Sequence, residues 1–204
     1  MYEKELECVM IVTNIEQIGK EKFKVITDEG VTYVLYKSEL RKYAVSENEE
    51  INYLKIEEML EKKAKKKVLD WLKFSDRTRE ELMQKLHQAG YSKEIAEKAV
   101  AYADSYGYLD DRRYGRNYVE YKGRSKSRRQ LEMELKNKGL SKEEIEQSLE
   151  EGKYDENEAL EKAFQKKLGS RRIEGMEREE KQKIASYLLR KGFSFEGVRQ
   201  KLEL

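Results

Sequence analysis

The chain of 204 residues contains no proline, one cysteine and one histidine, and it has no apolar run near the roughly 20 residues that a membrane-spanning helix needs. The lone Cys8 excludes an intramolecular disulfide, and with His87 as the sole histidine no usual zinc cluster can form. The sequence contains no glycine-rich phosphate-binding loop, so nothing in it indicates an ATPase. The N-terminus also lacks the segments of a secretion signal. We therefore expect a cytoplasmic protein that is not an enzyme, holds no cofactor or metal and has no membrane partner.

Charged residues make up 41% of the chain, yet 43 basic and 41 acidic side chains leave a formal net charge of only +2. Such mixed-sign charge is typical of long, solvated helices. With 38% hydrophobic residues, the chain can bury several small cores more readily than one large core. The composition therefore favours a soluble, mainly helical protein.

The pattern Leu-x-x-x-Gly-φ-Ser, in which φ is apolar, occurs three times, at 86–92, 135–141 and 188–194. Its recurrence at intervals of about 50 residues indicates tandem repeats. Each copy resembles a junction between two helices. The glycine supplies a left-handed residue past one helix end, the apolar residue folds back, and the serine caps the next helix.

Other positions repeat in register with these turns. Thr78-x-x-Glu81 and Ser127-x-x-Gln130 predict capping boxes, whereas the third copy has Glu180 and a weaker cap. Apolar residues at helical spacing follow each cap and each serine, and an earlier helix opens each repeat. The predicted core positions are Val68, Leu69, Leu72, Leu82, Leu86, Ile95 and Ala99; Tyr114, Tyr118, Tyr121, Leu131, Leu135, Ile145 and Leu149; and Leu160, Ala163, Phe164, Ile184, Leu188, Val198 and Leu202.

The first 54 residues have a strand-forming pattern and not the helical pattern of the repeats. Runs at 8–12, 23–25 and 32–36 are rich in β-branched and aromatic residues, and Asp28-Glu-Gly30 predicts a hairpin turn. We expect a helical turn at 40–44 and an acidic connector at 47–50. A sheet this small is marginal alone, so it must pack on another part of the chain, a second copy or a partner.

The predicted fold is mainly α, with three tandem three-helix repeats in an elongated array and a small N-terminal β-hairpin or sheet extension. We place the boundaries at 1–54 for the β extension and at 55–109, 110–154 and 155–204 for the repeats. Because residues 1–54 share no motif with the repeats, we expect a chain that starts near Lys55 to keep its helical structure and its core activity.

Several segments resemble the successive signatures of the RecX regulatory proteins. They are Phe74-Ser-Asp-Arg-Thr78 with Glu81-Leu82, Gly107-Tyr-Leu-Asp-Asp111 with Arg113-Tyr114, Glu134-Leu-Lys-Asn-Lys-Gly139 and Tyr187-Leu-Leu-Arg-Lys-Gly-Phe193. The resemblance covers roughly 60–204, and the β extension resembles that of many members from Gram-positive bacteria. Two departures are small: the order Asp28-Glu-Gly30, where Asp-Gly-Glu is commoner, and Gly115, where alanine is usual.

The resemblance implies a non-enzymatic modulator of the RecA recombinase. Such a protein lodges in the groove of the RecA filament on DNA and inhibits filament extension, ATPase and strand exchange, which tunes recombination, DNA repair and the SOS response. Some members also contact single- or double-stranded DNA. We expect this chain to act as a monomer.

A basic cluster in the second repeat is the candidate partner-binding site, because planar guanidinium groups suit both carboxylates and phosphates. Glu120 is the one acid within it, and the interleaved Tyr114, Tyr118 and Tyr121 are predicted to be core residues. An acidic segment at 143–158 follows and argues against simple coating of DNA. The basic cluster consists of Arg112, Arg113, Arg116, Lys122, Arg124, Lys126, Arg128 and Arg129.

An alternative function is DNA binding by helix-turn-helix-like repeats, with the helix after Ser92 or Ser141 in the major groove. Acids at Glu94 and at 143–144 argue against it, because they repel phosphates. The remaining candidates have plain structural interpretations: a solvated helix face for the lysine-rich run 62–67, a small buried hydrophobe for Cys8 and a core residue for Trp71. His87 lacks an oriented partner for catalysis.

Overall fold

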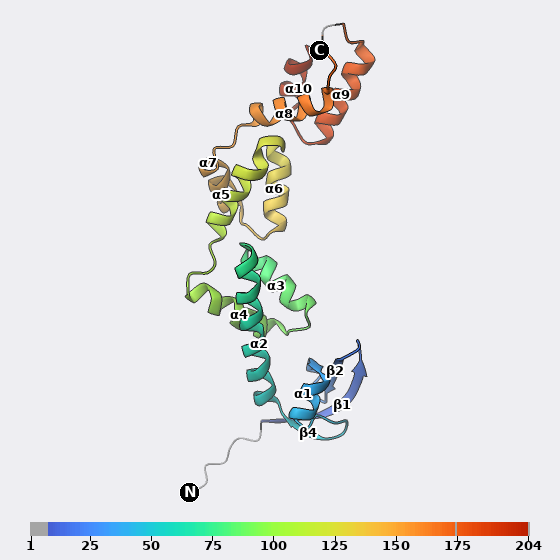
Figure 1. The fold of residues 1–204 in the computed structure, drawn as a ribbon, viewed down its shortest axis with the longest axis vertical. Coiled ribbons are helices and arrows are strands. Elements are labelled where there is room, and N and C mark those ends of the chain that lie inside the picture. The colour runs from blue at the N-terminus through green and yellow to red at the C-terminus, as the bar shows by residue number, and fades with distance from the viewer. Residues whose placement is uncertain (1–7, 174, 204) are drawn as a thin grey trace. The chain divides into compact units, whose positions relative to one another are not determined.

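A computed structural model describes residues 8–173 and 175–203, and the chain divides into two compact units between residues 109 and 110 (Figure 1). The first unit holds a sheet and the helices α1–α4, and the second holds α5–α10. The elements are β1 Val9–Gln17, β2 Lys22–Thr27, β3 Thr32–Tyr36, α1 Lys37–Lys42, β4 Glu50–Asn52, α2 Tyr53–Phe74, α3 Arg79–Gln88, α4 Lys93–Ser105, α5 Asp111–Lys122, the 3-10 helix η1 Gly123–Ser125, α6 Arg128–Asn137, α7 Lys142–Glu151, α8 Glu156–Leu168, α9 Arg178–Arg190 and α10 Phe195–Leu202.

The three-helix repeats are confirmed as α2–α4, α5–α7 and α8–α10. The turn glycines Gly90, Gly139 and Gly192 all have φ between +85° and +92°, the left-handed region that favours glycine. Hydroxyls of the serines after them accept hydrogen bonds from backbone N–H groups in the first turns of α4, α7 and α10. Local sequence alone therefore specifies how each repeat turns.

The predicted capping boxes are also present. Thr78 and Ser127 each exchange hydrogen bonds with the residue three positions later, at the starts of α3 and α6. In the third repeat, Glu177 precedes α9 and its side chain makes no capping hydrogen bond. The third cap is weaker, as the sequence predicts, but its position is corrected: it lies at Glu177, and Glu180 belongs to the first turn of α9.

The N-terminal extension is an antiparallel sheet with strand order β3-β2-β1-β4 in the described residues. The hairpin at 28–30 is confirmed, with Gly30 at φ +77°. The prediction of a connector at 47–50 is wrong at its end, because Glu50 begins β4 and pairs with Ile11. The predicted helical turn at 40–44 is shifted, because α1 begins at Lys37 and ends at Lys42.

One continuous hydrophobic core joins this sheet to the first repeat. Val12 and Leu35 of the sheet, Ile56 and Leu60 of α2, and Leu86 of α3 are all buried in it. The sequence left open whether the sheet packs on another part of the chain, a second copy or a partner. In the structure the sheet packs on another part of the chain, the first repeat. The change from strands to helices near residue 54 does not separate two cores.

The second unit holds two smaller cores, one around Leu131 and Leu135 and the other around Phe164 and Leu188. Most predicted core positions are buried. The prediction that Tyr121 is a core residue is wrong, because its side chain is 78% exposed. Gly115 and Val119 form the buried stripe of α5 instead, and Tyr114 and Tyr118 are half-buried. Leu69 and Leu72 are half-buried as well.

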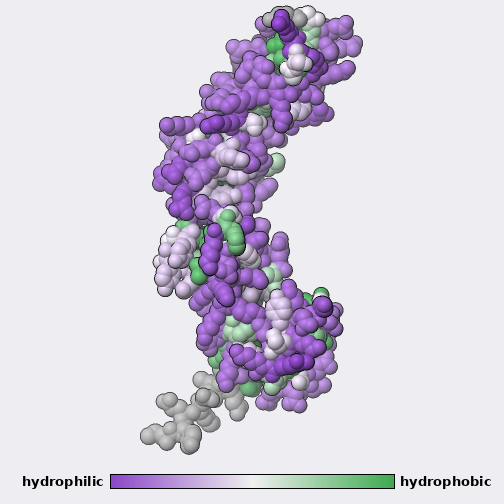
Figure 2. All heavy atoms as spheres, viewed as in Figure 1, coloured by the Kyte–Doolittle hydropathy of each residue, from purple (hydrophilic) through white to green (hydrophobic). Residues whose placement is uncertain are grey.

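Hydrophilic residues cover most of the face drawn in Figure 2, in keeping with the high charged fraction of the chain. None of the helices in the described residues is both long and apolar enough to cross a membrane. Exposed charged side chains and exposed aromatic side chains such as Tyr121 are candidates for partner recognition.

Candidate partner-binding surface

The basic cluster lies on three consecutive pieces of the second repeat. Arg112, Arg113, Arg116 and Lys122 belong to α5, Arg124 to η1, Lys126 to the connection, and Arg128 and Arg129 to the first turn of α6. Asp110 caps α5 by accepting a hydrogen bond from the Arg113 N–H, and Ser127 caps α6. The two caps fix where each helix begins and hence which way the basic side chains leave it.

Two arginines of the basic cluster are paired with the acidic segment at 143–158. Arg112 forms an ion pair with Glu151 of α7. Arg128 bonds Glu132 of α6 at 2.8 Å and Glu146 of α7 at 2.5 Å. These hydrogen bonds raise the pKa of both arginines, and the bond from Arg112 lowers the pKa of Glu151. Part of the charge that the sequence assigns to partner binding is therefore satisfied within the repeat.

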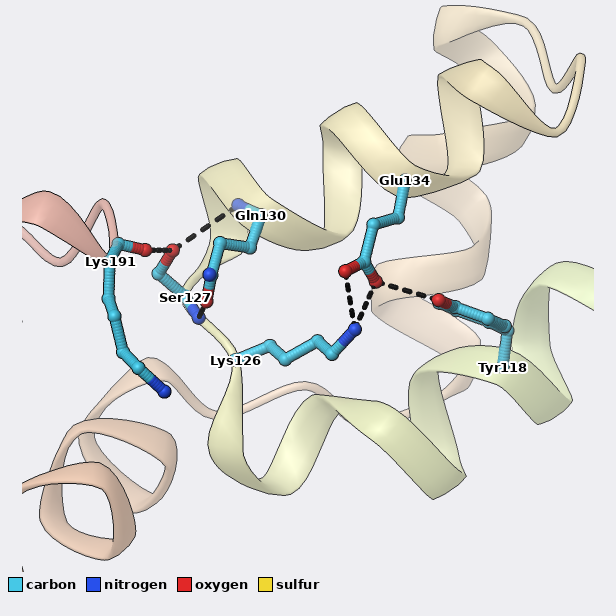
Figure 3. Close-up of polar contacts among 6 residues, drawn as sticks. All are labelled: Tyr118, Lys126, Ser127, Gln130, Glu134 and Lys191. Atoms are coloured by element: carbon cyan, nitrogen blue, oxygen red, sulfur yellow. Dashed lines mark hydrogen bonds and ion pairs between the residues drawn. The ribbon is translucent and has the colours of Figure 1, made fainter.

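Lys126 is also engaged internally, as Figure 3 shows. Its ammonium group pairs with the Glu134 carboxylate, which accepts a further hydrogen bond from the Tyr118 hydroxyl at 2.7 Å. Burial opposes ionisation of Glu134, but the bonds from Lys126 and Tyr118 outweigh it and lower the pKa of this carboxyl. Lys126 therefore ties the connection before α6 to α5 and α6 and does not reach out to a partner.

The tyrosines of α5 support this arrangement. The rings of Tyr114 and Tyr118 stack with centroids 6.1 Å apart, and the Lys138 ammonium lies 5.3 Å and 5.5 Å from their centroids. Tyr121 instead faces solvent beside Lys122, whose ammonium is 4.7 Å from its ring centroid. One basic and aromatic pair of the cluster thus remains on the surface.

Four basic side chains of the cluster make no ion pair in the part of the chain that the structure describes: Arg116, Lys122, Arg124 and Arg129. Arg116 borders an open depression of about 550 Å³ that also contacts Asp110, Arg113 and Glu151. These four cations form the reduced basic surface, and they can pair with carboxylates or phosphates of a partner without breaking an internal bond.

A contact with the third repeat holds the start of α6 in place, and no pattern in the sequence indicates it. The buried Ser127 hydroxyl accepts a hydrogen bond from the Gln130 N–H and donates one to the Lys191 carbonyl at 2.6 Å (Figure 3). Tyr154, just before α8, donates a hydrogen bond to the Lys126 carbonyl at 3.0 Å. The glycine turn of the third repeat therefore braces the helix start that carries Arg128 and Arg129.

Replacement of Ser127 by alanine tests this brace. Ser127→Ala removes the cap and also leaves the Lys191 carbonyl without its donor, so we expect a loss of about 2–3 kcal/mol in the free energy of unfolding. Ser141→Ala is the matched control, because Ser141 forms the same capping box but is exposed; its expected loss is about 1 kcal/mol. Urea denaturation measures both, and equal losses would contradict the brace.

The remaining candidates have structural roles or open surroundings. The Trp71 ring is half-buried beneath the Lys85 ammonium at 5.0 Å and is not a full core residue. Cys8 lies just before β1 and is half-buried, so the prediction of a buried hydrophobe is only partly right. His87 is exposed. In the run 62–67, Lys63 pairs with Glu39 and Lys65 with Glu61.

No group of three or more metal-ligating side chains occurs among the described residues. The candidate surface carries charged, hydrogen-bonding and aromatic groups on helices. Such groups can form ion pairs and hydrogen bonds with a charged partner.

Comparison with known proteins gives matches to three domains of one family. The first three-helix domain of RecX matches residues 64–102, the second residues 110–149 and the third residues 154–202. The regulatory protein RecX of Caldanaerobacter subterraneus subsp. tengcongensis is 31% identical over 190 residues, which cover 92% of this chain and 82% of that protein. The regulatory protein RecX of Bacillus licheniformis is 30% identical over 192 residues, covering 91% of this chain and 73% of that protein.

Solved structures show the same fold. A crystal structure of regulatory protein RecX matches with a TM-score of 0.61 at 23% identity, covering 95% of this chain and 98% of that one. RecX from Lactobacillus salivarius matches with a TM-score of 0.58 at 24% identity, covering 71% and 97%. Since the three family domains together span more than half of the sequence, in order and without overlap, this chain belongs to the RecX family of regulatory proteins.

Proposed function

We propose that this protein binds the RecA recombinase and its filament on DNA and inhibits filament extension, ATPase and strand exchange. Recombination, DNA repair and the SOS response would be tuned in this way. Membership of the RecX family across all three repeats carries the proposal, because the relatives are named regulatory proteins. The proposal includes action as a monomer in the cytoplasm, without catalysis or cofactor, and added contacts to single- or double-stranded DNA.

The reduced basic surface supports a charged partner. Arg116, Lys122, Arg124 and Arg129 keep their donors available, whereas the paired residues Arg112, Lys126 and Arg128 hold the shape of the repeat. Tyr121, at 78% exposure, adds an aromatic side chain of the kind enriched at protein interfaces. Charged and aromatic groups side by side suit a partner surface that presents carboxylates.

The alternative function is DNA binding by helix-turn-helix-like repeats, with α4 or α7 in the major groove. The first turns of these helices carry Glu94, Glu143 and Glu144. The Glu144 carboxylate accepts a hydrogen bond from the Ser141 N–H at 2.7 Å, which fixes a negative charge where base edges and phosphates would lie. Carboxylates at this position repel the DNA backbone, so the geometry favours the RecA filament as the partner.

Charge reversal of the reduced basic surface tests the proposal. In the variant Lys122→Glu, Arg124→Glu, Arg129→Glu, all three positions are exposed and none breaks an ion pair. We expect binding to RecA filaments on single-stranded DNA to weaken at least about tenfold, with a nearly unchanged melting temperature, because exposed charges contribute little to folding. Reversal of Arg112 or Arg128 is avoided, since each would place two carboxylates together.

The matched control is Lys20→Glu, Lys37→Glu, Lys66→Glu, which changes the net charge equally at three exposed positions of the first unit. It is expected to bind filaments nearly as the unaltered protein does. Binding to bare DNA, measured in parallel across a salt series, should fall steeply with salt if phosphates dominate and less steeply for a protein groove. If the first variant folds and binds filaments normally, the surface is only solvated and the site lies in the first or third repeat.

A further inference from the structure

A groove between α8 and α9 in the third repeat was not singled out by the sequence. It has a volume of about 650 Å³ and contacts Lys167 of α8 together with residues spaced along one face of α9. These residues of α9 are Gln182, Lys183, Ser186, Tyr187 and Arg190, with Glu179 at one end. The groove therefore combines cations, hydrogen-bonding groups and one aromatic ring, and has no aliphatic side chain in its lining.

The groove carries an excess of positive charge, with Glu179 as the carboxylate in its lining. Lys167, Lys183, Arg190 and the adjacent Lys191 form no ion pair within residues 8–173 and 175–203. Other cations of the same repeat do have partners: Lys162 pairs with Glu158, Lys201 with Glu161 and Arg171 with Glu180. Since like charges held together repel, cations that outnumber the lining carboxylate of Glu179 and form no ion pairs are suited to an external anion.

The Tyr187 ring contacts two of these cations. The Lys167 and Lys191 ammonium groups lie 5.0 Å and 5.2 Å from the centroid of its ring, which places positive charge close to the aromatic system. With two lysines against it, the ring does not offer an open platform for stacking a base. The groove is therefore built to contact charged oxygens and not to read nucleobases.

We propose that the α8–α9 groove binds the phosphodiester backbone of a nucleic acid, without sequence preference, as a second contact surface made of other residues than the reduced basic surface. Lysine and arginine donors pair with phosphate oxygens, and Gln182 and Ser186 supply neutral hydrogen bonds alongside them. An acidic protein segment fits less well, because protein interfaces bury an apolar centre that this lining lacks. The inference rests on the DNA contacts that the proposed function includes, but it does not depend on binding to RecA.

The test uses the full chain and a labelled oligonucleotide, single-stranded or duplex, without RecA. In the variant Lys167→Glu, Lys183→Glu, Arg190→Glu we expect affinity to fall at least about tenfold. The slope of log affinity against log salt should become shallower by about 2 for the single strand and about 3 for the duplex, the contribution of three phosphate contacts. Fluorescence anisotropy from low to moderate salt measures both quantities.

The control is again Lys20→Glu, Lys37→Glu, Lys66→Glu, which should change affinity less than about threefold and leave the slope intact. If charge reversal unfolds the third repeat, as judged by circular dichroism, the variant Lys167→Gln, Lys183→Gln, Arg190→Gln replaces it with the same expected direction. The proposal is overturned if the groove variant matches the control, or if the unaltered protein does not bind the oligonucleotide at low salt. Binding to polyglutamate is measured in the same way as a probe for an acidic protein. If the groove variant loses binding to polyglutamate but keeps its binding to the oligonucleotide, the occupant of the groove is an acidic protein and the proposal is overturned.

Discussion

Removal of residues 1–54 is expected to unfold the first repeat, because the sheet and the helices α2–α4 share one core. Val12, Val25 and Leu35 are fully buried against a cluster that includes Ile56 and Leu60 of α2. A chain beginning at Lys55 would expose this face of α2 to water, and the lost burial of Ile56 and Leu60 alone, about 3–6 kcal/mol, is comparable with the usual margin of stability. This expectation replaces the one drawn from sequence, in which such a chain keeps its helical structure.

Far-ultraviolet circular dichroism and urea denaturation of the chain that starts at Lys55 measure the effect. We expect a loss of helical signal corresponding to the first repeat and the disappearance of its cooperative transition. Two substitutions in the intact chain compare the buried face of the sheet with its exposed face. Leu35→Ala should cost about 2–5 kcal/mol, whereas Ile11→Ala, at a side chain that is 43% exposed, should cost less than about 1 kcal/mol. Full helicity and an unchanged transition in the shortened chain would contradict the shared core.

The repeats and their turns could be predicted because their determinants are local. A left-handed glycine, a serine cap and leucines one turn apart act within about ten residues, so Gly139 and Ser141 carry their structural meaning in the sequence itself. The strand β4 could not be found in this way. Its three residues form a strand only because Ile51 and its neighbours pair with β1, about 40 residues earlier.

The candidate site was predicted less completely, because charge in the sequence does not say which charges meet. Arg112 and Glu151 are far apart along the chain and are joined by the packing of α5 on α7. That packing depends on Gly115, where an added Cβ would lie 2.1 Å from the Ser148 hydroxyl oxygen. The cations of the α8–α9 groove likewise come together only when the helices pack. The domain boundaries at 54, 109 and 154, and the role of the basic cluster, stay predictions.

Substitution of Gly90 is expected to destabilise the first unit through two separable effects. Gly90 has φ +92°, and a Cβ there would lie 2.6 Å and 2.8 Å from the Cγ2 and Cβ atoms of Val34 in β3. Gly90→Ala should therefore cost about 1–2 kcal/mol for the left-handed backbone and a further 1–3 kcal/mol, roughly, for the overpacked contact. Gly30→Ala is the matched control, since Gly30 has φ +77° with nothing within 4 Å, and it should show only the backbone cost.

A double-mutant cycle with Val34→Ala isolates the contact between the glycine turn and the sheet. Val34→Ala removes both γ-carbons that crowd the new methyl group but keeps the Cβ at 2.8 Å, so the relief is partial; the double variant should be more stable than the sum of the single losses predicts by about 0.5 kcal/mol or more. Urea denaturation of the four proteins in the cycle gives this coupling energy. Equal losses for Gly90→Ala and Gly30→Ala, with no coupling to Val34, would mean that the turn does not press against β3. The sheet would then stabilise the first repeat through the shared core and not through the glycine turn.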